Sequence, residues 1–413
     1  MERRRALALA VNRGFSALGG QIVITILPVV VYMISHSMAL AGMVLGARLL
    51  MATIFTPFMG VSVDRFNPLA LMAASLGVRV VLFSLMAETK AIPLLAVLAM
   101  ATAVFGMLEA PAVGALTPRL VSAEALPRTN AIISSGLNLA FVAGPFLGGV
   151  IIARGSAQWG FFAAAASQAV SLAVLWLLPS PPAAEQGLVA TPGSGAVPES
   201  GAVQGSAAPR QAVLAQLRTG MRFAFADRFL RIMLTVYAVF ILGLTAFNVL
   251  AIGLSFRFHM GSAGYGILIA LQAVGMLAVT FVAAKWLRAS FVGPLFLLNM
   301  PIQGAAIIGV SLSPTFLLCA VFACVQGIGW GMEQASVMTI IQQRTPSAVQ
   351  GRVFGLFFSV LSVAETVGVS FFGWLGGRWG DSQALALAGT ISLVFALIGI
   401  VLLRPLIADA SPA

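Results

Sequence analysis

Long apolar runs recur along the whole chain, and they limit its fold more than any other feature. A bilayer core needs about 20 apolar residues per crossing helix, and a backbone in lipid must satisfy its own polar groups. Twelve segments meet that length, at residues 15–34, 40–60, 69–86, 92–116, 131–152, 160–178, 232–254, 265–284, 291–312, 316–341, 353–375 and 384–403. The sequence therefore predicts an all-α, polytopic membrane protein with twelve transmembrane helices.

The composition excludes a soluble globular protein. Hydrophobic residues make up 60% of the 413 positions and charged residues only 8%, which is more apolar surface than a soluble core can bury. The net charge of +11 would suggest nucleic acid as the partner of a soluble protein. No basic stretch with interleaved aromatic residues occurs outside the membrane-flanking loops, so we expect the basic residues to meet lipid headgroups and expect no nucleic-acid binding.

The distribution of basic residues predicts the orientation. With twelve spans both termini share one side, and seventeen Lys and Arg residues fall on that side against four on the other. Basic residues gather in cytoplasmic loops. We therefore expect a multi-pass protein of the cytoplasmic membrane with both termini in the cytoplasm.

The chain divides into two predicted six-helix bundles, residues 1–178 and 229–413. Between them, residues 179–209 are almost entirely Pro, Ala, Gly, Ser, Val and Gln, which is typical of a disordered linker. The rest of the 179–228 segment carries apolar residues at helical spacing, which indicates an amphipathic helix on the membrane surface. A frayed helical lead into the seventh span explains that spacing equally well.

The two predicted bundles resemble each other at a fixed offset of 224 residues, from residues 39–154 to residues 263–378. Identical residues stand at both members of six pairs: Gly42 and Gly266, Glu109 and Glu333, Arg128 and Arg352, Gly144 and Gly368, Gly149 and Gly373, Arg154 and Arg378. A repeat in sequence implies a repeated structure. We expect two pseudo-symmetric, parallel six-helix halves.

A short motif lies between the second and third spans, where Gly60 is followed by Asp64 and Arg65. It resembles the Gly-x-x-x-Asp-Arg signature of the major facilitator superfamily, and the six-plus-six plan resembles that family throughout. The resemblance implies a gating loop that latches the two halves on the cytoplasmic side, with the acid facing a helix N-terminus near Arg352. Negative charge is stabilised at that end of a helix. The basic continuation of the family pattern is absent, and an ordinary turn with one ion pair is the alternative.

The fifth span carries a second motif, in which Gly144 and Pro145 precede Gly148 and Gly149. It is similar to the Gly-Pro-x-x-Gly-Gly element of the family's exporters, and this similarity implies outward transport. Glycines also let helices approach closely, so tight packing alone is the alternative. The run from Glu109 to Val121 further resembles the branch that contains macrolide-efflux and siderophore-export proteins.

Charged residues at membrane depth are the candidate proton and substrate pathway, because each one is costly unless it is paired or hydrated. The repeat places polar residues on matching helices around a shared centre, where transporters of this plan bind substrate. This candidate set comprises Arg48, Arg79, Glu109, Gln272, Gln303, Glu333 and Glu365.

Proton exchange needs a carboxyl group that changes its protonation as its surroundings change. Glu109 and Glu333 meet that need by position, and the alternative for each is a static ion pair with an arginine of a neighbouring helix. Glu365 has no charged counterpart in the repeat. The fourth span lacks the arginine that many drug and proton antiporters carry, and Arg48 or Arg79 is the candidate substitute.

No enzyme is expected, since the sequence holds no phosphate-binding loop and no His and Cys cluster for a metal or other cofactor. The resemblance instead implies a secondary transporter that exports a small organic solute by alternating access in exchange for protons. Two rival hypotheses remain: an uptake or facilitative carrier, including one for a metal or metal chelate, and a membrane scaffold or sensor without transport.

Overall fold

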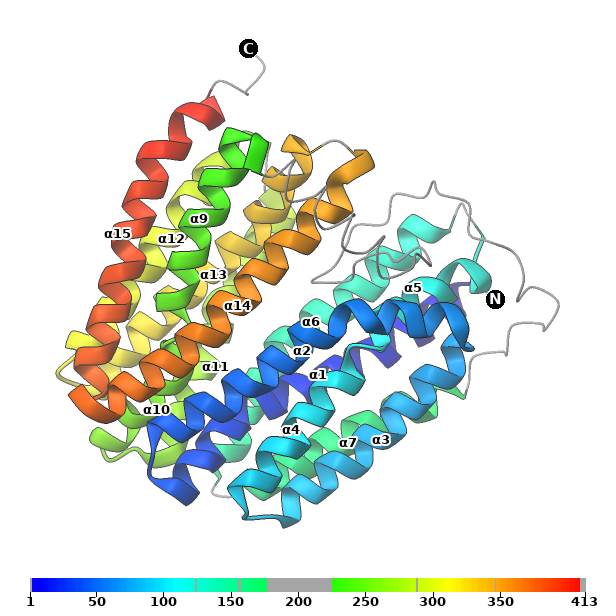
Figure 1. The fold of residues 1–413 in the computed structure, drawn as a ribbon, viewed down its shortest axis with the longest axis horizontal. Helices are drawn as coiled ribbons and strands as arrows, with labels where there is room; N and C mark the ends of the chain where they lie inside the picture. The colour runs from blue at the N-terminus through cyan, green and yellow to red at the C-terminus, as the bar shows by residue number, and fades with distance from the viewer. Residues whose placement is uncertain are drawn as a thin grey trace.

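A computed structural model describes most of the chain (Figure 1). The described residues are 2–122, 125–154, 157–176, 225–286, 289–345 and 347–408. Within the helices, the side chains of residues 56–65, 280–290 and 347–352 and of a few single positions are not described. The predicted linker and surface helix at 179–228 lie outside the described residues except for their last four positions.

The first half of the chain forms seven helical segments in the described residues. They are α1 (Glu2–Ser35), α2 (Met38–Arg65), α3 (Pro68–Glu88), α4 (Ile92–Gly106), α5 (Glu109–Leu120), α6 (Leu126–Ala153) and α7 (Ala157–Leu175). The second half forms α9 (Arg228–Leu244), α10 (Phe247–Arg257), α11 (Gly261–Trp286), α12 (Ala289–Leu312), α13 (Phe316–Arg344), α14 (Ser347–Trp379) and α15 (Asp381–Ala408).

Twelve stretches of these described helices are long and apolar enough to cross a membrane, which confirms the predicted all-α, twelve-span fold. Two spans are broken, because α4 and α5 together form the fourth and α9 and α10 the seventh. Pro111 explains the first break. Its ring nitrogen cannot donate to the carbonyl of Met107, four residues earlier, and its ring crowds that carbonyl. The helix therefore restarts at Glu109.

Polar residues set several helix boundaries beyond the predicted spans. The side chain of Asn67 accepts from the Leu69 amide at 2.9 Å, and Pro68 occupies the first turn of α3, an arrangement that suits the start of a helix. Asp227 caps α9 in the same way, accepting from the Leu230 amide at 2.8 Å. As a result α9 begins four residues before its predicted span, because no Pro or Gly lies between Asp227 and residue 232.

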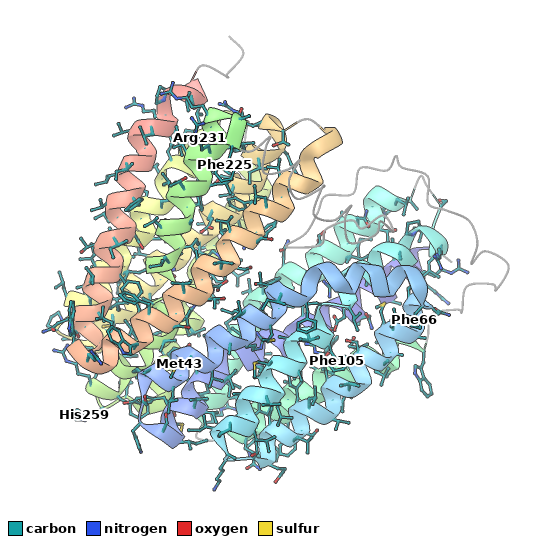
Figure 2. All side chains as sticks on the ribbon, in the orientation of Figure 1. Met43, Phe66, Phe105, Phe225, Arg231 and His259 are labelled. Carbon is teal, nitrogen blue, oxygen red and sulfur yellow. The ribbon has the colours of Figure 1, made fainter. Side chains whose placement is uncertain are left out.

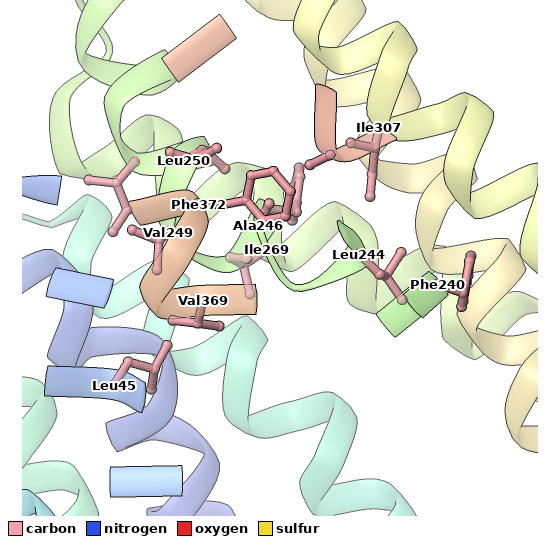
Figure 3. Close-up of a cluster of buried hydrophobic side chains, with 14 of the residues drawn as sticks. Leu45, Phe240, Leu244, Ala246, Val249, Leu250, Ile269, Ile307, Val369 and Phe372 are labelled. Atoms are coloured by element: carbon pink, nitrogen blue, oxygen red, sulfur yellow. The ribbon is translucent and has the colours of Figure 1, made fainter. Parts of the chain in front are cut away.

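The helices fall into two groups that meet at one end and separate toward the other. Figure 1 shows α1–α7 and α9–α15 close together near α10 and the start of α2, and apart at the end that carries both termini. We call these the far end and the termini end. Figure 3 shows part of the contact, with Leu45 of α2 near Val369 of α14. Both belong to a buried apolar cluster that spans the two groups.

Large apolar side chains also cover the outside of the molecule. Met43, Phe66 and Phe225, labelled in Figure 2, are 48%, 63% and 50% exposed. Trp176, Leu317 and Val401 are more exposed still. Such a surface is unfavourable in water and suits contact with lipid.

Candidate functional site

Glu109 lies at the centre of a buried ionic cluster in the first half. It occupies the first turn of α5 and is 2% exposed. Arg13 of α1 donates to its Oε2 at 2.9 Å, and Arg79 of α3 donates to its Oε1. Ser16 donates to the same carboxylate. Glu109 is thus ion-paired with arginines of neighbouring helices, which is the contact that the alternative for this residue requires.

Gln168 of α7 completes this cluster. Its Nε2 donates to the Ser16 carbonyl at 2.9 Å, and the Arg79 guanidinium donates to the Ser16 hydroxyl at 3.0 Å. Arg13 and Ser16 were not among the candidate residues, because nothing in the sequence links the N-terminal end of the first span to the fourth span. Arg13 had been counted with the basic residues that flank the membrane, whereas its side chain is 16% exposed in the ion pair.

At the corresponding position, the second half has a chain of glutamine amides that ends on one carboxyl group. Gln303 of α12 donates to Glu333 Oε2 of α13 at 3.0 Å, and Gln326 donates to Gln303 Oε1 at 3.4 Å. Gln272 of α11 in turn donates to Gln326. The structure thus brings together Gln272, Gln303 and Glu333 of the candidate set through Gln326, which the sequence analysis did not identify.

The polar centres around Glu109 and Glu333 share one arrangement of side chains but carry different charges. Arg79 and Glu109 are 30 residues apart, as are Gln303 and Glu333, and each pair forms one hydrogen bond between matching helices. The offset of 224 residues also takes Arg13 to Tyr237, a buried residue of α9 that interacts electrostatically with Glu333. Both arginines of the first half therefore have neutral counterparts in the second.

The repeat extends beyond the residues from which it was predicted. Gln168 bonds the Ser16 carbonyl, and Ser392 bonds the Phe240 carbonyl, with the same separation of 152 residues. These positions differ by the same offset as the predicted pairs. The shared geometry therefore includes the first and last helices of each half.

Arg48 and Glu365 lie on opposite halves, in α2 and α14. Arg48 is 7% exposed, its Nε has no hydrogen-bond partner among the described residues, and its charge interacts with those of Arg79 and Glu365. Glu365 also interacts with Glu333. Within the part of the chain described, no basic nitrogen lies within 4.0 Å of either Glu333 or Glu365.

The predicted gating loop is part of a helix. Gly60, Asp64 and Arg65 belong to the last turns of α2, which continues to Arg65, so the expectation of a loop at these residues was wrong. The helix continues past Pro57 and Gly60 and ends only before Asn67 and Pro68, where the residue that precedes a proline disfavours the helical conformation. The side chains of these residues and of Arg352 lie outside the described set, so the latch remains a prediction.

The glycines of the fifth-span motif pack against two different neighbours. A Cβ atom at Gly148 would lie 3.1 Å from Thr25 Cβ of α1, and one at Gly144 would collide with Gln21 of α1. A Cβ atom at Gly149 would instead overlap the backbone of Gly266 in α11. The motif thus packs α6 both within its own half and against the other half, and α6 stays continuous through Pro145.

Among the described residues, no three His, Cys, Asp or Glu side chains gather in a way that could hold a metal ion. The buried charges form two related polar centres, one in each half. Residues 9–369 match the sequence profile of the Major Facilitator Superfamily. The chain belongs to this superfamily. It is therefore a multi-pass secondary transporter of small molecules and not an enzyme.

The chain is similar to further proteins, among them two relatives and two solved structures. It is 27% identical to the enterobactin exporter EntS of Shigella boydii serotype 4 over 92% of this chain and 86% of the relative. The EntS protein of Citrobacter koseri is also 27% identical, over 73% and 67%. A bacterial homologue of the human lysosomal transporter Spinster, in an inward-facing and unoccupied conformation, superposes with a TM-score of 0.75 at 14% identity, covering 100% and 99% of the chains. The nucleoside transporter NupG gives 0.71 at 13% identity, covering 98% and 100%.

Proposed function

We propose that this transporter exports a small organic solute across the cytoplasmic membrane by alternating access, in exchange for protons. Export is supported by the similarity to enterobactin exporters, which extends over nine tenths of the chain for one of them. The Gly144–Gly149 motif of α6 adds support, because two of its glycines pack within one half and the third packs on the other half. A siderophore, secondary metabolite or drug-like compound fits this proposal.

The proposed orientation puts both termini in the cytoplasm. The excess of basic residues on the termini end supports it. In this orientation the arrangement in Figure 1 is inward-facing, with the halves in contact at the outer end and separated at the cytoplasmic end. The latch of Asp64 toward Arg352 would then form when the cytoplasmic end closes.

The asymmetry of the buried charges carries the proposal for proton exchange. Glu109 is held by two arginines and a hydroxyl, and removing one partner from such a buried ion pair is costly. Glu333 and Glu365 have no such cation within 4.0 Å in the described residues. An unpaired carboxylate at low dielectric gains much from binding a proton. We assign proton exchange to Glu333 and Glu365, and a structural role to Glu109.

Efflux from cells tests this proposal. Cells that produce the protein are loaded with a panel of siderophores, macrolides and amphipathic dyes, and efflux is followed with and without a protonophore. We expect outward flux that the protonophore abolishes. We expect Glu333→Gln to reduce active efflux at least about tenfold at equal levels of folded protein, because the amide keeps the hydrogen bond to Gln303 but cannot exchange a proton.

The matched control is Gln303→Ala, which removes the hydrogen bond to the same carboxylate while leaving its proton exchange in place. Active efflux that survives Glu333→Gln and Glu365→Gln would contradict the assignment of the protons. Inward flux would favour an uptake or facilitative carrier, including one for a metal chelate. Absence of flux for the whole panel, with the protein folded in the membrane, would favour the scaffold or sensor hypothesis.

A further inference from the structure

We propose that Arg48 and Glu365 form an ion pair across the two halves when the termini end closes, and that this pair stabilises the closed conformation. In the arrangement described here their charges interact, but no salt bridge within 4.0 Å joins them. The inference adds a positioning residue, Arg48, to the proposed function and rests on its alternating access.

The packing of α2 against α14 sets the level of the two side chains. A Cβ atom at Gly42 would lie 2.6 Å from the Val369 carbonyl, and one at Gly46 would lie 3.2 Å from the Thr366 carbonyl. The two helices are antiparallel across this contact, since the partner number falls as the α2 number rises. Continuing this register by two residues brings Arg48 to the level of Glu365.

Arg48 also marks the edge of the closed interface. Residues 41, 42, 44, 45 and 46 of α2 are buried, and so is Arg48, but none of residues 49–55 is buried. Beyond this level the two groups of helices separate toward the termini end (Figure 1). A rotation that closes the termini end must bring the next turns of α2 and α14 together, and the first charged residues to meet are Arg48 and Glu365.

The lack of an oppositely charged group within 4.0 Å of either side chain, among the described residues, favours this pairing. The buried Nε of Arg48 has no partner among the described residues, and a buried donor without a partner is unfavourable. The other charged groups near the pair are Arg79, which interacts with Arg48, and Glu333, which interacts with Glu365. Arg79 has the same charge as Arg48, and Glu333 the same as Glu365, so neither neighbour can take the place of the missing partner.

The repeat supplies a substitution that the fold should accept. The counterpart of Arg48 in the second half is Gln272, which is 7% exposed like Arg48. Arg48→Gln therefore installs the residue that the same structural position already carries in the other half. Glu365→Gln is its partner variant, and Arg48→Glu with Glu365→Arg restores opposite charges in reverse.

Spin labels at the termini end test the pair. Cysteines replace Phe66, which is 63% exposed after α2, and the exposed Gln343 of α13, with Cys319 and Cys324 replaced by alanine. Electron–electron distances are measured in lipid nanodiscs. In the parent protein we expect a long distance and a shorter one from the closed conformation. Each single variant should reduce the fraction of the shorter distance at least about fivefold, and the charge exchange should restore part of it.

An unchanged short-distance fraction in both single variants would overturn the proposal, as would loss of that fraction in the charge exchange at normal folding. Absence of any short distance in the parent would also overturn it, because the pair would then have no closed conformation to stabilise. The measurement needs no transported solute. Failure of export in the efflux assay would therefore leave the ion pair untouched. Loss of the ion pair in the distance measurement would likewise leave the result on export untouched.

Discussion

Glu109→Gln is expected to lower the free energy of unfolding by about 3–5 kcal/mol, the usual cost of removing one partner from a buried ion pair. The reason is that Arg13 and Arg79 would keep their charges with no carboxylate between them, in a place where Glu109 is 2% exposed and Arg79 5%. Little folded protein should be recovered. Thermal unfolding in detergent, followed by the fluorescence of the six tryptophans, measures the loss.

The matched control is the same substitution at the repeat counterpart. Glu333→Gln changes a carboxylate whose described partner is the amide of Gln303, and an amide oxygen can accept that hydrogen bond. We expect the free energy of unfolding to change by less than about 1 kcal/mol. Equal losses in the two variants would mean that Glu109 and Glu333 are in equivalent electrostatic environments, contrary to the structure.

Gly149→Ala is expected to open the far end and to abolish coupled transport. The added methyl group would overlap the backbone of Gly266, and backbone atoms cannot move aside as a flexible side chain can. Overpacking of this kind costs about 1–3 kcal/mol, and every 1.4 kcal/mol changes an equilibrium about tenfold. The conformation closed at the far end should become roughly 5- to 150-fold less favourable.

The labelling rate of a buried cysteine measures this opening. Met38 is 5% exposed, and its backbone carbonyl packs near Gly373 at the far end. Met38→Cys in a background without Cys319 and Cys324 should react faster with a hydrophilic maleimide when Gly149→Ala is added. Gly77→Ala is the control, because a Cβ atom at Gly77 meets nothing within 4 Å. An equal labelling rate in the parent and in Gly149→Ala would show that the contact does not seal the far end.

Apolar length and residue spacing carried most of the fold prediction. Each of the twelve predicted spans overlaps helices of the structure, although the sixth was predicted to run to residue 178 and α7 ends at Leu175. Lipid leaves the backbone almost no alternative to a helix. The repeat was readable because Glu109 and Glu333 are rare charges in an apolar chain. It also placed Arg79 and Gln303 in one candidate set with these acids, and in the structure each donates to the acid of its own half.

The remaining features depend on helix rotation and tertiary contact. Arg13 looks like an ordinary flanking charge until α1 is placed beside α5, and Gln326 is one of many amides until α11 and α12 bracket it. The end of α2 was misread because the sequence motif gives no sign of where the helix stops. Relative positions of the halves are likewise absent from a sequence, so the level shared by Arg48 and Glu365 emerged only from the glycine contacts.

Those glycine contacts have a further consequence. Gly42 packs on Gly373, and Gly149 packs on Gly266. In repeat terms Gly266 is a second Gly42, and Gly373 is a second Gly149. The interface is therefore isologous: one patch is used twice around a two-fold axis, as in a symmetric homodimer. A single six-helix unit already presents a self-complementary face, and joining two such units in one chain lets each carry different charges without altering their contact.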